Sequence, residues 1–534
     1  MKSVIRSTSN MDSLWKKDAS GLYKDIFANI NRVEMLPGIS HNQFCIALGV
    51  TQNKKQNEVS MKCRQAGNTK VNEKNWHDAM LLYNRSLCFA EEDTENVTLA
   101  YANRSLCFLK MEMYDKCLID IEMAINAKYP ERLMSKLEDR RAYCLKHTNK
   151  TSFLPNETQK LDFEADEHFP GMANVLQMKY SKKFGRHFIA KCDIDVGKTV
   201  LVEEPFVKTT IFKQDFGICD SCFKNMTNFI PCPNCTSALF CSEDCANDLF
   251  HTLRCGRRST SDNILVEFVL NSILRAGEIM CSIEEWMEFV ENVVKEKNVE
   301  EVPLSIVDDK SKYRMFLKLN LWMTEENKKD HVDRANEVFD MLMRIQDIKD
   351  SFDTLKKMRF LMHLCIMHVN LVRCNSFHTE MYGGIFLIRN HLNHSCAPNI
   401  LCSAFQNKSI CISSRRIKKG DQLFISYGDT YWDPHPLHER QQNLWNDFGF
   451  QCKCEKCRNT NWPISSEKVQ SDPDFQNIQA DLWKEKFGYP DLAKCVSRKR
   501  TCLELLKKYS DLPWCTQLDL VSKGFQTACV ESLF

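Results

Sequence analysis

The stretch Asn393-His394-Ser395-Cys396-Ala397-Pro398-Asn399 indicates most clearly how this chain folds. Two further motifs follow it, Ile425-Ser426-Tyr427-Gly428-Asp429 and Phe450-Gln451-Cys452-Lys453-Cys454-Glu455-Lys456-Cys457. The second of these offers three thiols, one fewer than the four ligands of a closed tetrahedral zinc site. Each motif alone is a hypothesis that needs context. Their order and spacing favour one functional domain over a coincidence of a loop, a strand and a cysteine cluster.

This series resembles the carboxyl half of a SET domain with its post-SET zinc cluster. A second region, Gly185 to Pro205, resembles the amino half of such a domain, with the pattern G-R-x-x-x-A-x-x-x-I-x-x-G-x-x-x-x-x-E-x-P. The resemblance implies transfer of a methyl group from S-adenosylmethionine, usually to a lysine amine. His187 departs from the family, which usually has a second glycine there for close backbone approach to the cofactor.

The resemblance also implies roles for individual residues. Tyr427 would be the catalytic residue, with its hydroxyl beside the transferring methyl group, and Phe448 would line the lysine channel. Cys396 would be the fourth ligand of the zinc site at Cys452, Cys454 and Cys457. The cofactor would be held by Arg186, Asn375, Asn393, His394, Tyr427 and Phe450. The attacking amine must be neutral although free lysine titrates near pH 10.4, so an apolar channel and the sulfonium charge have to lower its pKa.

Residues 219–255 contain eight candidate zinc ligands in 37 residues. Structural zinc sites use paired ligands two to four residues apart, and eight ligands suffice for two closed sites that stabilise a fold rather than activate water. The spacing resembles a MYND zinc finger, a family that interleaves its pairs. By that resemblance, one site is Cys219, Cys222, Cys241 and Cys245, and the other is Cys232, Cys235, His251 and Cys255.

Residues 60–147 carry a helical repeat. Aligning Ala79 with Cys117 gives an offset of 38 residues, which fits the 34-residue period of a tetratricopeptide (TPR) helix pair plus a short insertion. Such an array either binds a peptide or braces the structure. A MYND module between SET halves, preceded by repeats, resembles the TPR-bearing branch of the SET and MYND domain-containing (SMYD) protein-lysine methyltransferases.

Composition narrows the class of protein. A formal charge of +2 gives no global footprint for nucleic acid. The 27 cysteines, several in Cys-x-x-Cys pairs, indicate zinc in a reducing compartment. We see no secretory signal and no run long enough to span a membrane, and expect a cytoplasmic and nuclear monomer. Expected partners are a protein substrate with a lysine, proline-rich peptides at the MYND module and peptide tails at the repeats.

The predicted fold class is a multidomain α+β protein, with a β-rich SET domain split by a MYND finger and a helical insertion. The predicted function is an S-adenosylmethionine-dependent protein-lysine methyltransferase with three zinc ions, acting on histone or non-histone lysines. The alternative, which His187 favours, is a scaffold or transcriptional corepressor with a weak or silent SET domain.

The predicted segments are an N-terminal helical segment (1–57), TPR-like repeats (60–147), the SET amino half (171–218), the MYND finger (219–255), the helical insertion (256–375), the SET carboxyl half (376–431), the post-SET segment (432–460) and a C-terminal helical region (461–534).

Overall fold

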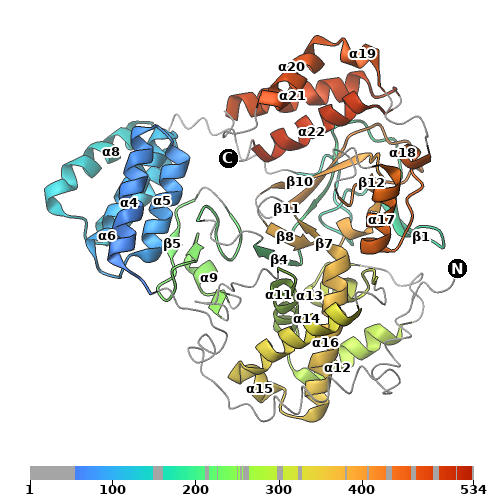
Figure 1. Ribbon diagram of the computed structural model, residues 1–534, viewed down its shortest axis with the longest axis horizontal. Coiled ribbons are helices and arrows are strands. Elements are labelled where there is room, and N and C mark those ends of the chain that lie inside the picture. Colours follow the sequence, from blue (N-terminus) through green and yellow to red (C-terminus); the bar gives the residue numbers. More distant parts are fainter. Residues whose placement is uncertain are drawn as a thin grey trace. The chain divides into compact units, whose positions relative to one another are not determined.

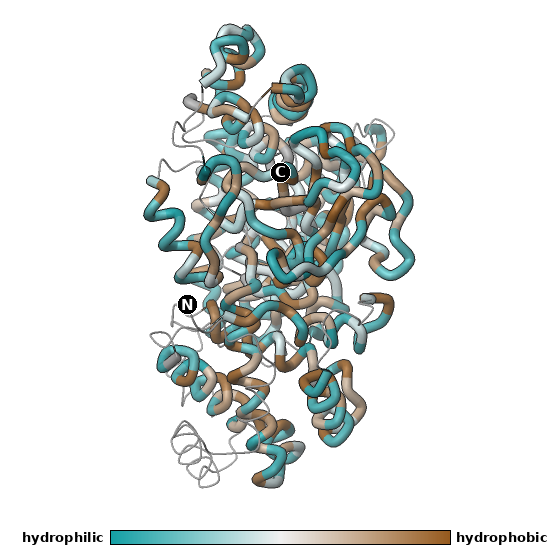
Figure 2. Tube along the Cα trace, turned by 90° about the vertical axis from the view of Figure 1, so that its right-hand side faces the viewer, coloured by the Kyte–Doolittle hydropathy of each residue, from teal (hydrophilic) through white to brown (hydrophobic). Residues whose placement is uncertain are grey.

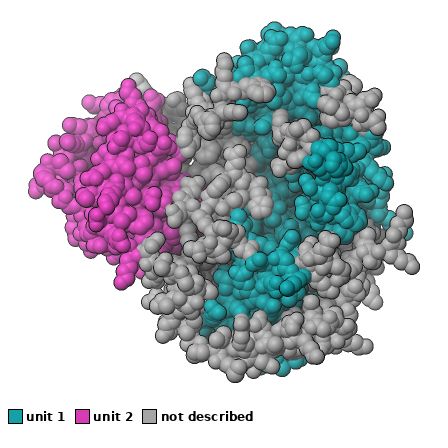
Figure 3. Space-filling view, in the orientation of Figure 1, with its two compact units in different colours: residues 1–37, 159–209, 263–534 teal, residues 38–158, 210–262 magenta. Residues whose placement is uncertain are grey.

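The computed structural model divides the chain into two compact units (Figure 3). One comprises residues 38–158 and 210–262, and the other comprises residues 1–37, 159–209 and 263–534. The structure describes residues 54–147, 160–210, 216–224, 227–248, 251–252, 255, 264–296, 305–322, 328–378, 382–405, 408–428, 436–458, 465–484, 492–512 and 514–531. Of the N-terminal helical segment predicted for residues 1–57, residues 1–53 lie outside these ranges.

Five α-helices form the N-terminal helical array in the first unit (Figure 1): α4 (Asn57–Asn72), α5 (Trp76–Phe89), α6 (Glu95–Lys110), α7 (Tyr114–Asn126) and α8 (Met134–His147), with the 3₁₀ turn η1 (Glu131–Leu133) before α8. Consecutive helices pack against each other. Gly67 lets α4 and α5 approach closely, because a Cβ at this position would lie 2.5 Å from the Tyr83 ring. Lys74 and Glu112 follow α4 and α6 in the left-handed region (φ 59° each), where the backbone turns back toward the next helix.

A cysteine-rich segment, residues 216–255, completes this unit. It contains the antiparallel pair β5 (Ile230–Pro231) and β6 (Leu239–Phe240) and the short helix α9 (Glu243–Ala246). Its apolar cluster includes Phe216, Phe229 and Phe240, and it also takes in Cys88 from α5. The segment and the array therefore share one hydrophobic core, although residues 148–215 lie between them in the sequence.

Among the described residues, the second unit contains the remaining strands in four small sheets. The hairpin β1 (Leu176–Ser181) and β2 (Gly185–Ala190) turns at Gly185, whose φ is +63°. The strands β10 (Ile400–Phe405), β11 (Lys408–Ser413) and β3 (Thr199–Glu203) form an antiparallel sheet in that order. The order β4 (Val207–Thr210), β8 (Tyr382–Ile385), β7 (Ser376–His378) forms another, and β12 (Phe424–Ile425) pairs in parallel with β9 (Asn393–His394).

The predicted insertion is helical: α11 (Ile264–Ile279), α12 (Ile283–Lys295), α13 (Asp309–Leu317), α14 (Lys328–Met343), α15 (Gln346–Ser351) and α16 (Leu355–Asn375). Side-chain caps start three of these helices, since Ser282, Asp308 and Thr354 each accept a hydrogen bond from a first-turn backbone N–H. Figure 2 shows hydrophobic and hydrophilic positions alternating along the helices, as expected of elements that bury one face.

The C-terminal helices pack on the β3-containing sheet. They are α19 (Glu467–Gln470), α20 (Pro473–Lys484), α21 (Leu492–Lys508) and α22 (Thr516–Glu531), and they follow α17 (Leu437–Phe448) and α18 (Glu455–Arg458). Ile410 and Ile412 of β11 share a core with Phe475 and Val521 of these helices. The whole layout is the α+β class that the sequence predicts. None of the helices among the described residues is long and apolar enough to cross a membrane.

Candidate active site and metal centres

The pairing of β9 with β12 brings two of the three sequence motifs together. Asn393 lies opposite Phe424 and His394 opposite Ile425 in a parallel register. The ladder continues where the Ser395 N–H donates to the Ile425 carbonyl at 2.9 Å. This short parallel pair places His394 beside the residues that follow β12, including Tyr427.

His394 connects Tyr427 to the cysteine cluster. Its Nδ1 accepts a hydrogen bond from the Tyr427 backbone N–H at 3.1 Å, so the ring proton resides on Nε2. Nε2 lies 3.3 Å from the Cys396 Sγ, to which it donates. Burial lowers the pKa of His394 to about 4 and keeps the ring neutral. The imidazole is thus a fixed link between a candidate zinc ligand and the candidate catalytic residue.

Aromatic rings surround the Tyr427 side chain. Its ring centroid lies 4.9 Å from that of Phe448, 6.2 Å from Phe450 and 6.3 Å from Phe377. The phenol donates to the Leu392 carbonyl at 2.9 Å, and burial raises its pKa. The hydroxyl is therefore a neutral donor with a fixed direction in apolar surroundings.

Gly449 makes this aromatic arrangement possible. It ends α17 in the left-handed conformation (φ 72°), and its N–H donates to the Trp445 carbonyl. A Cβ at this position would lie 2.3 Å from the Trp322 indole, so both the backbone angle and the space require glycine. The turn directs Phe448 and Phe450, on either side of it, toward Tyr427.

The other candidate cofactor residues come from β2, β9 and the end of α16. The Arg186 Nη1 donates to the Lys318 carbonyl at 3.2 Å, and burial lowers the pKa of Arg186. The Asn375 Nδ2 donates to the Asn320 and Leu371 carbonyls at 2.8 Å each. The Asn393 Nδ2 donates to the Phe184 carbonyl at 3.0 Å.

His187, the departure from the family pattern, is a buried residue of β2. Its Nδ1 lies 3.0 Å from the Gly185 carbonyl oxygen, and its ring makes an edge contact with Phe184 at 5.7 Å. The imidazole is thus held against its own hairpin by local contacts.

Buried polar atoms of the adjacent residues Asn390 and His391 support a cofactor site beside Asn375. The Asn390 Nδ2 donates to the Asn375 carbonyl at 3.0 Å, whereas its Oδ1 is buried without a hydrogen-bond partner among the described residues. The buried His391 Nε2 has none there either, and burial lowers the pKa of His391 to about 3, so it is a neutral ring. Buried polar atoms normally find partners, and the polar groups of S-adenosylmethionine fit these atoms.

The zinc centre predicted at Cys396, Cys452, Cys454 and Cys457 has the ligands that the resemblance implies. Cys396 lies 3.6 Å from Cys457 and 4.0 Å from Cys452, measured between sulfur atoms. These three thiols and that of Cys454 lie within 4.8 Å of one another, which suits one tetrahedral zinc ion. The Arg440 Nη2 donates to the Cys457 Sγ at 3.8 Å.

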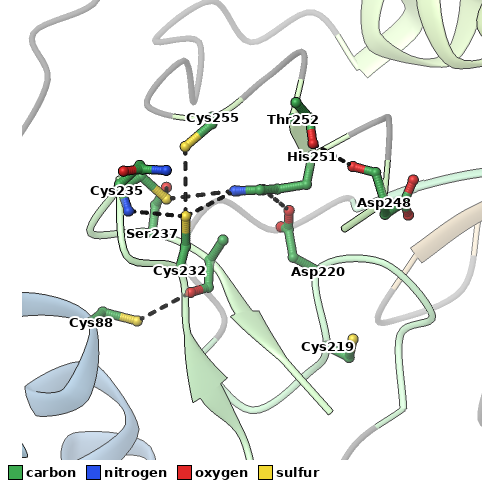
Figure 4. A network of polar contacts seen from close by, with 12 residues as sticks. Cys88, Cys219, Asp220, Cys232, Cys235, Ser237, Asp248, His251, Thr252 and Cys255 are labelled. Carbon is green, nitrogen blue, oxygen red and sulfur yellow. Dashed lines mark hydrogen bonds and ion pairs between the residues drawn. The ribbon is translucent and has the colours of Figure 1, made fainter. Parts of the chain in front are cut away.

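The cysteine-rich segment contains two more such centres, with the interleaved pairing that the family resemblance implies. Cys219, Cys222, Cys241 and Cys245 form one cluster, and Cys232, Cys235, His251 and Cys255 form the other. Figure 4 shows the second cluster, with the His251 ring directed at Cys232 and Cys235. Its Nε2 lies 3.3 Å from the Cys232 Sγ and its Nδ1 lies 2.9 Å from Asp220. That carboxylate orients the ring, as outer-sphere partners of zinc-bound histidines do. The three clusters suit three zinc ions.

Comparison with known proteins agrees with this geometry. A family model described as "SET domain" matches residues 268–428. The protein-lysine N-methyltransferase SMYD4 of Danio rerio is 24% identical over 76% of this chain and 66% of its own length. SMYD4 of Homo sapiens is 23% identical over 84% of this chain and 72% of its own length. The histone-lysine N-methyltransferase SET5 of Yarrowia lipolytica is 24% identical over 54% of this chain and 65% of its own length. The chain thus spans about two thirds of the length of these relatives.

Residues 268–428 thus match the SET domain family, and the chain is similar to SMYD4 proteins over most of its length. The similarities support a SET-type lysine methyltransferase, for which S-adenosylmethionine is the cofactor that the family implies.

Sequence reasoning missed several residues at this SMYD-type site. Asp220 had a usable signal, since it directly follows a zinc ligand. Phe377 stands two residues after the candidate cofactor residue Asn375, but its contact with Tyr427 and the Arg389 guanidinium 3.9 Å above its ring were not predicted. The Leu392 carbonyl could not be found from sequence, because every residue has one.

Proposed function

We propose that this protein is an S-adenosylmethionine-dependent protein-lysine N-methyltransferase that acts on lysines of histone or non-histone proteins. The link from Cys396 through His394 to Tyr427 carries the proposal most directly. It ties a zinc-binding cysteine, a neutral buried imidazole and a buried phenol into one rigid arrangement inside an aromatic enclosure. S-adenosylmethionine would supply the methyl group when bound.

The chain's own residues would do two things for that reaction. The rings of Phe377, Phe448 and Tyr427 would desolvate the incoming lysine and lower its pKa, because burial disfavours the charged ammonium form. Arg186, a cation whose Nη1 contacts a neutral carbonyl, would attract the carboxylate of the cofactor. Fixed donors and rings position the reactants, and positioning accounts for much of the rate in an in-line transfer.

The experiment is a paired measurement of cofactor affinity and single-turnover methyl transfer. Tyr427→Phe should bind the cofactor nearly as tightly as the parent but transfer methyl groups at least tenfold more slowly, because the hydroxyl acts on the reacting centre. Asn393→Ala should lose cofactor affinity first. Tyr143→Phe, which changes an exposed tyrosine of α8, serves as the matched control. Parent-like turnover by Tyr427→Phe would refute the catalytic assignment.

His187 supports a second candidate function. A buried imidazole stands where the family usually has a glycine, so cofactor binding would be weak and the protein would act as a scaffold or corepressor. His187→Gly separates the two functions. If it raises cofactor affinity from undetectable to measurable, the parent is a scaffold; if the parent already binds the cofactor, the enzyme function holds.

The proposed partners follow from the same segments. The substrate is a protein lysine, the cysteine-rich segment takes proline-rich peptides, and the N-terminal helical array takes peptide tails. We propose a monomer in the cytoplasm and nucleus, with zinc ions that stabilise the cysteine-rich segment and take no part in catalysis.

Variants with substitutions on the exposed surface of the cysteine-rich segment should keep methyl transfer to a short peptide while losing a proline-rich partner. Equal loss of both would place the segment in the active site.

A further inference from the structure

Two cysteines outside the zinc-ligand clusters face each other on adjacent strands of the second unit. Cys402 of β10 lies directly opposite Cys411 of β11 in the antiparallel register. Their sulfur atoms are 3.1 Å apart, whereas the close sulfur pairs of the zinc-ligand clusters are 3.4 to 4.0 Å apart. Among the described residues, no third metal ligand joins Cys402 and Cys411 in a cluster. Their geometry therefore suits a bond between the two sulfur atoms rather than a shared metal ion.

The sheet directs both thiols to the same face. Successive residues of a strand point to opposite faces, and Ile410 and Ile412, on either side of Cys411, pack into the core with the C-terminal helices. Cys411 therefore points away from those helices, and so does Cys402, because directly opposite residues share a face. A disulfide has a sulfur–sulfur bond of about 2.05 Å, so the two sulfur atoms have to approach by only about 1 Å.

The two cysteines differ in access to solvent. Cys411 belongs to the central strand of the sheet and has no exposed surface. Cys402 belongs to the edge strand β10 and is partly exposed. A small oxidant in solution therefore reaches Cys402 first, while its neighbour is protected from direct attack.

The surrounding charges favour a thiolate on Cys402 and a thiol on Cys411. A hydrogen bond from Cys411 lowers the pKa of Cys402, and the Arg389 cation acts in the same direction. Arg389 is held beside the sheet, where its Nη1 donates to the Ser409 hydroxyl at 3.2 Å. Burial raises the pKa of Cys411, and the Glu203 carboxylate adds to this rise. The thiolate is the nucleophilic form of cysteine, so charge and exposure both select Cys402 as the first to react.

We propose that Cys402 and Cys411 are a redox modification site, at which a peroxide forms a reversible disulfide between β10 and β11. The Cys402 thiolate attacks one peroxide oxygen, the O–O bond breaks, and the departing hydroxide takes up a proton to give water. Cys402 is then a sulfenic acid, which condenses with a thiol. The Cys411 sulfur attacks the Cys402 sulfur, the S–O bond breaks, and the departing hydroxide takes the Cys411 proton. Two thiols and hydrogen peroxide thus give one disulfide and two molecules of water.

The experiment treats the zinc-loaded full chain with hydrogen peroxide, alkylates the remaining thiols and maps the tryptic peptides. Trypsin places Cys402 in residues 390–408 and Cys411 in residues 409–415, so the disulfide appears as a linked pair of these two peptides. We expect peroxide to raise the amount of the linked pair at least tenfold and dithiothreitol to return it to the untreated level, because a dithiol reduces disulfides by exchange. Bound zinc is measured on the same samples, since Cys396 lies in the first of these peptides.

Two serine variants test the order of reaction. Cys411→Ser should stop at a sulfenic acid on Cys402, which a 1,3-dione reagent traps. Cys402→Ser should leave Cys411 unmodified, because that thiol is buried. Neither variant should give the linked pair. Cys192→Ser removes an exposed cysteine that lies outside both strands, and this matched control should give as much linked pair as the parent.

The outcomes are read from the parent first, so a serine variant that fails to fold does not remove the test. Absence of the linked pair in the peroxide-treated parent would overturn the site, and so would a linked pair that forms only in samples that have lost zinc. A sulfenic acid trapped on Cys411 in Cys402→Ser would overturn the order of reaction. None of these readouts uses methyl transfer, so they are independent of the proposed methyltransferase function.

Discussion

His368 of α16 illustrates how a single buried residue limits the conditions under which this protein is stable. The Trp286 Nε1 donates to the Tyr313 hydroxyl at 3.1 Å, and that hydroxyl, 3.2 Å from the His368 Nε2, donates to it. The ring proton is then on Nδ1, which donates to the Ser272 hydroxyl at 2.8 Å. The Ser272 hydroxyl in turn donates to the Val269 carbonyl. Every donor in this series of hydrogen bonds has one acceptor. A second ring proton, on the His368 Nε2, would remove the acceptor of the Tyr313 hydroxyl and break the series.

Acid should therefore destabilise the helical insertion through His368. Burial lowers the pKa of His368 to about 3, against an ordinary value of 6.5. The unfolded state binds the extra proton between these values, so stability is full above about pH 6.5 and falls as the pH drops toward 3. His363 contributes in the same direction, since burial lowers its pKa to about 4.

The measurement is the free energy of unfolding from pH 7.5 to pH 4.5 for the parent and His368→Gln. Glutamine can still accept from Tyr313 and donate to Ser272 but does not titrate, so its curve should be flatter by up to about 1.4 kcal/mol per pH unit. His438→Gln, which changes a largely exposed histidine, should follow the parent. Parallel curves for the parent and His368→Gln would contradict this explanation.

Individual residues were predictable where their chemistry is distinctive and their spacing is short. Cysteine pairs are typical of zinc sites, and the zinc pairing follows from the family pattern, so the three ligand clusters were predicted from sequence. The cofactor and catalytic residues came only from motif resemblance and remain predictions. The Ser272–His368–Tyr313 chain could not be predicted, because its members are 41 to 96 residues apart and each is an ordinary helix residue.

At the scale of elements, a fully buried ion pair joins α6 to α7. Arg104 and Asp120 have no exposed side-chain surface, and the guanidinium binds both carboxylate oxygens at 2.7 Å. The Arg104 Nη1 also donates to the Asn84 Oδ1 of α5 at 2.8 Å. The array thus has a buried polar group that connects three helices, in addition to its apolar core.

Asp120→Asn should destabilise the unit that contains the array by about 3–5 kcal/mol, because it leaves a buried arginine without its counter-charge. The free energy of unfolding from urea titration is the measurement, with helical signal as the probe. Arg132→Ala breaks the exposed pair with Glu95 and should change that free energy little. If both variants lose a similar free energy of unfolding, burial of the ion pair does not explain the loss in Asp120→Asn.

The helices themselves were predictable from periodicity, but their partners were not. The small residues Gly67, Ala79, Ala102 and Ala124 predict closely packed helix pairs, and consecutive helices of the array pack against each other. Nothing in the repeat pattern indicates that Asn84 and Asp120 serve a second segment. Such residues appear in sequence only as polar positions on otherwise apolar faces.

At the scale of the molecule, the chain joins two segments that the sequence presents as separate domains. The Asn228 Nδ2 donates to the Asp120 Oδ1 at 2.7 Å and to the Lys116 carbonyl at 2.9 Å. The Asn84 Nδ2 donates to the Phe216 carbonyl at 2.7 Å. The Cys88 Sγ lies 3.7 Å from the Ala238 carbonyl oxygen, to which it donates (Figure 4). The buried ion pair of the helices is thus also an anchor for the cysteine-rich segment.

Loss of zinc from the cysteine-rich segment should therefore loosen the N-terminal helices as well. A zinc-built segment of this size depends on its metal for folding, and its unfolding would expose Asp120, Asn84 and Cys88 on the helices. We expect Cys232→Ser to bind fewer than the three zinc ions of the parent and to speed amide hydrogen exchange in α5 and α7 at least tenfold.

Cys452→Ser provides the matched comparison, because it removes a ligand of the centre in the other compact unit. It should also bind fewer than three zinc ions, and it should weaken cofactor binding through His394. Exchange in α5 and α7 should stay at the parent rate. If Cys232→Ser loses its metal but leaves that exchange unchanged, the helices are stable without the cysteine-rich segment. The contacts of Asn84 and Asn228 would then only dock two parts that fold independently. If both variants accelerate exchange equally, the effect is global and does not pass through these contacts.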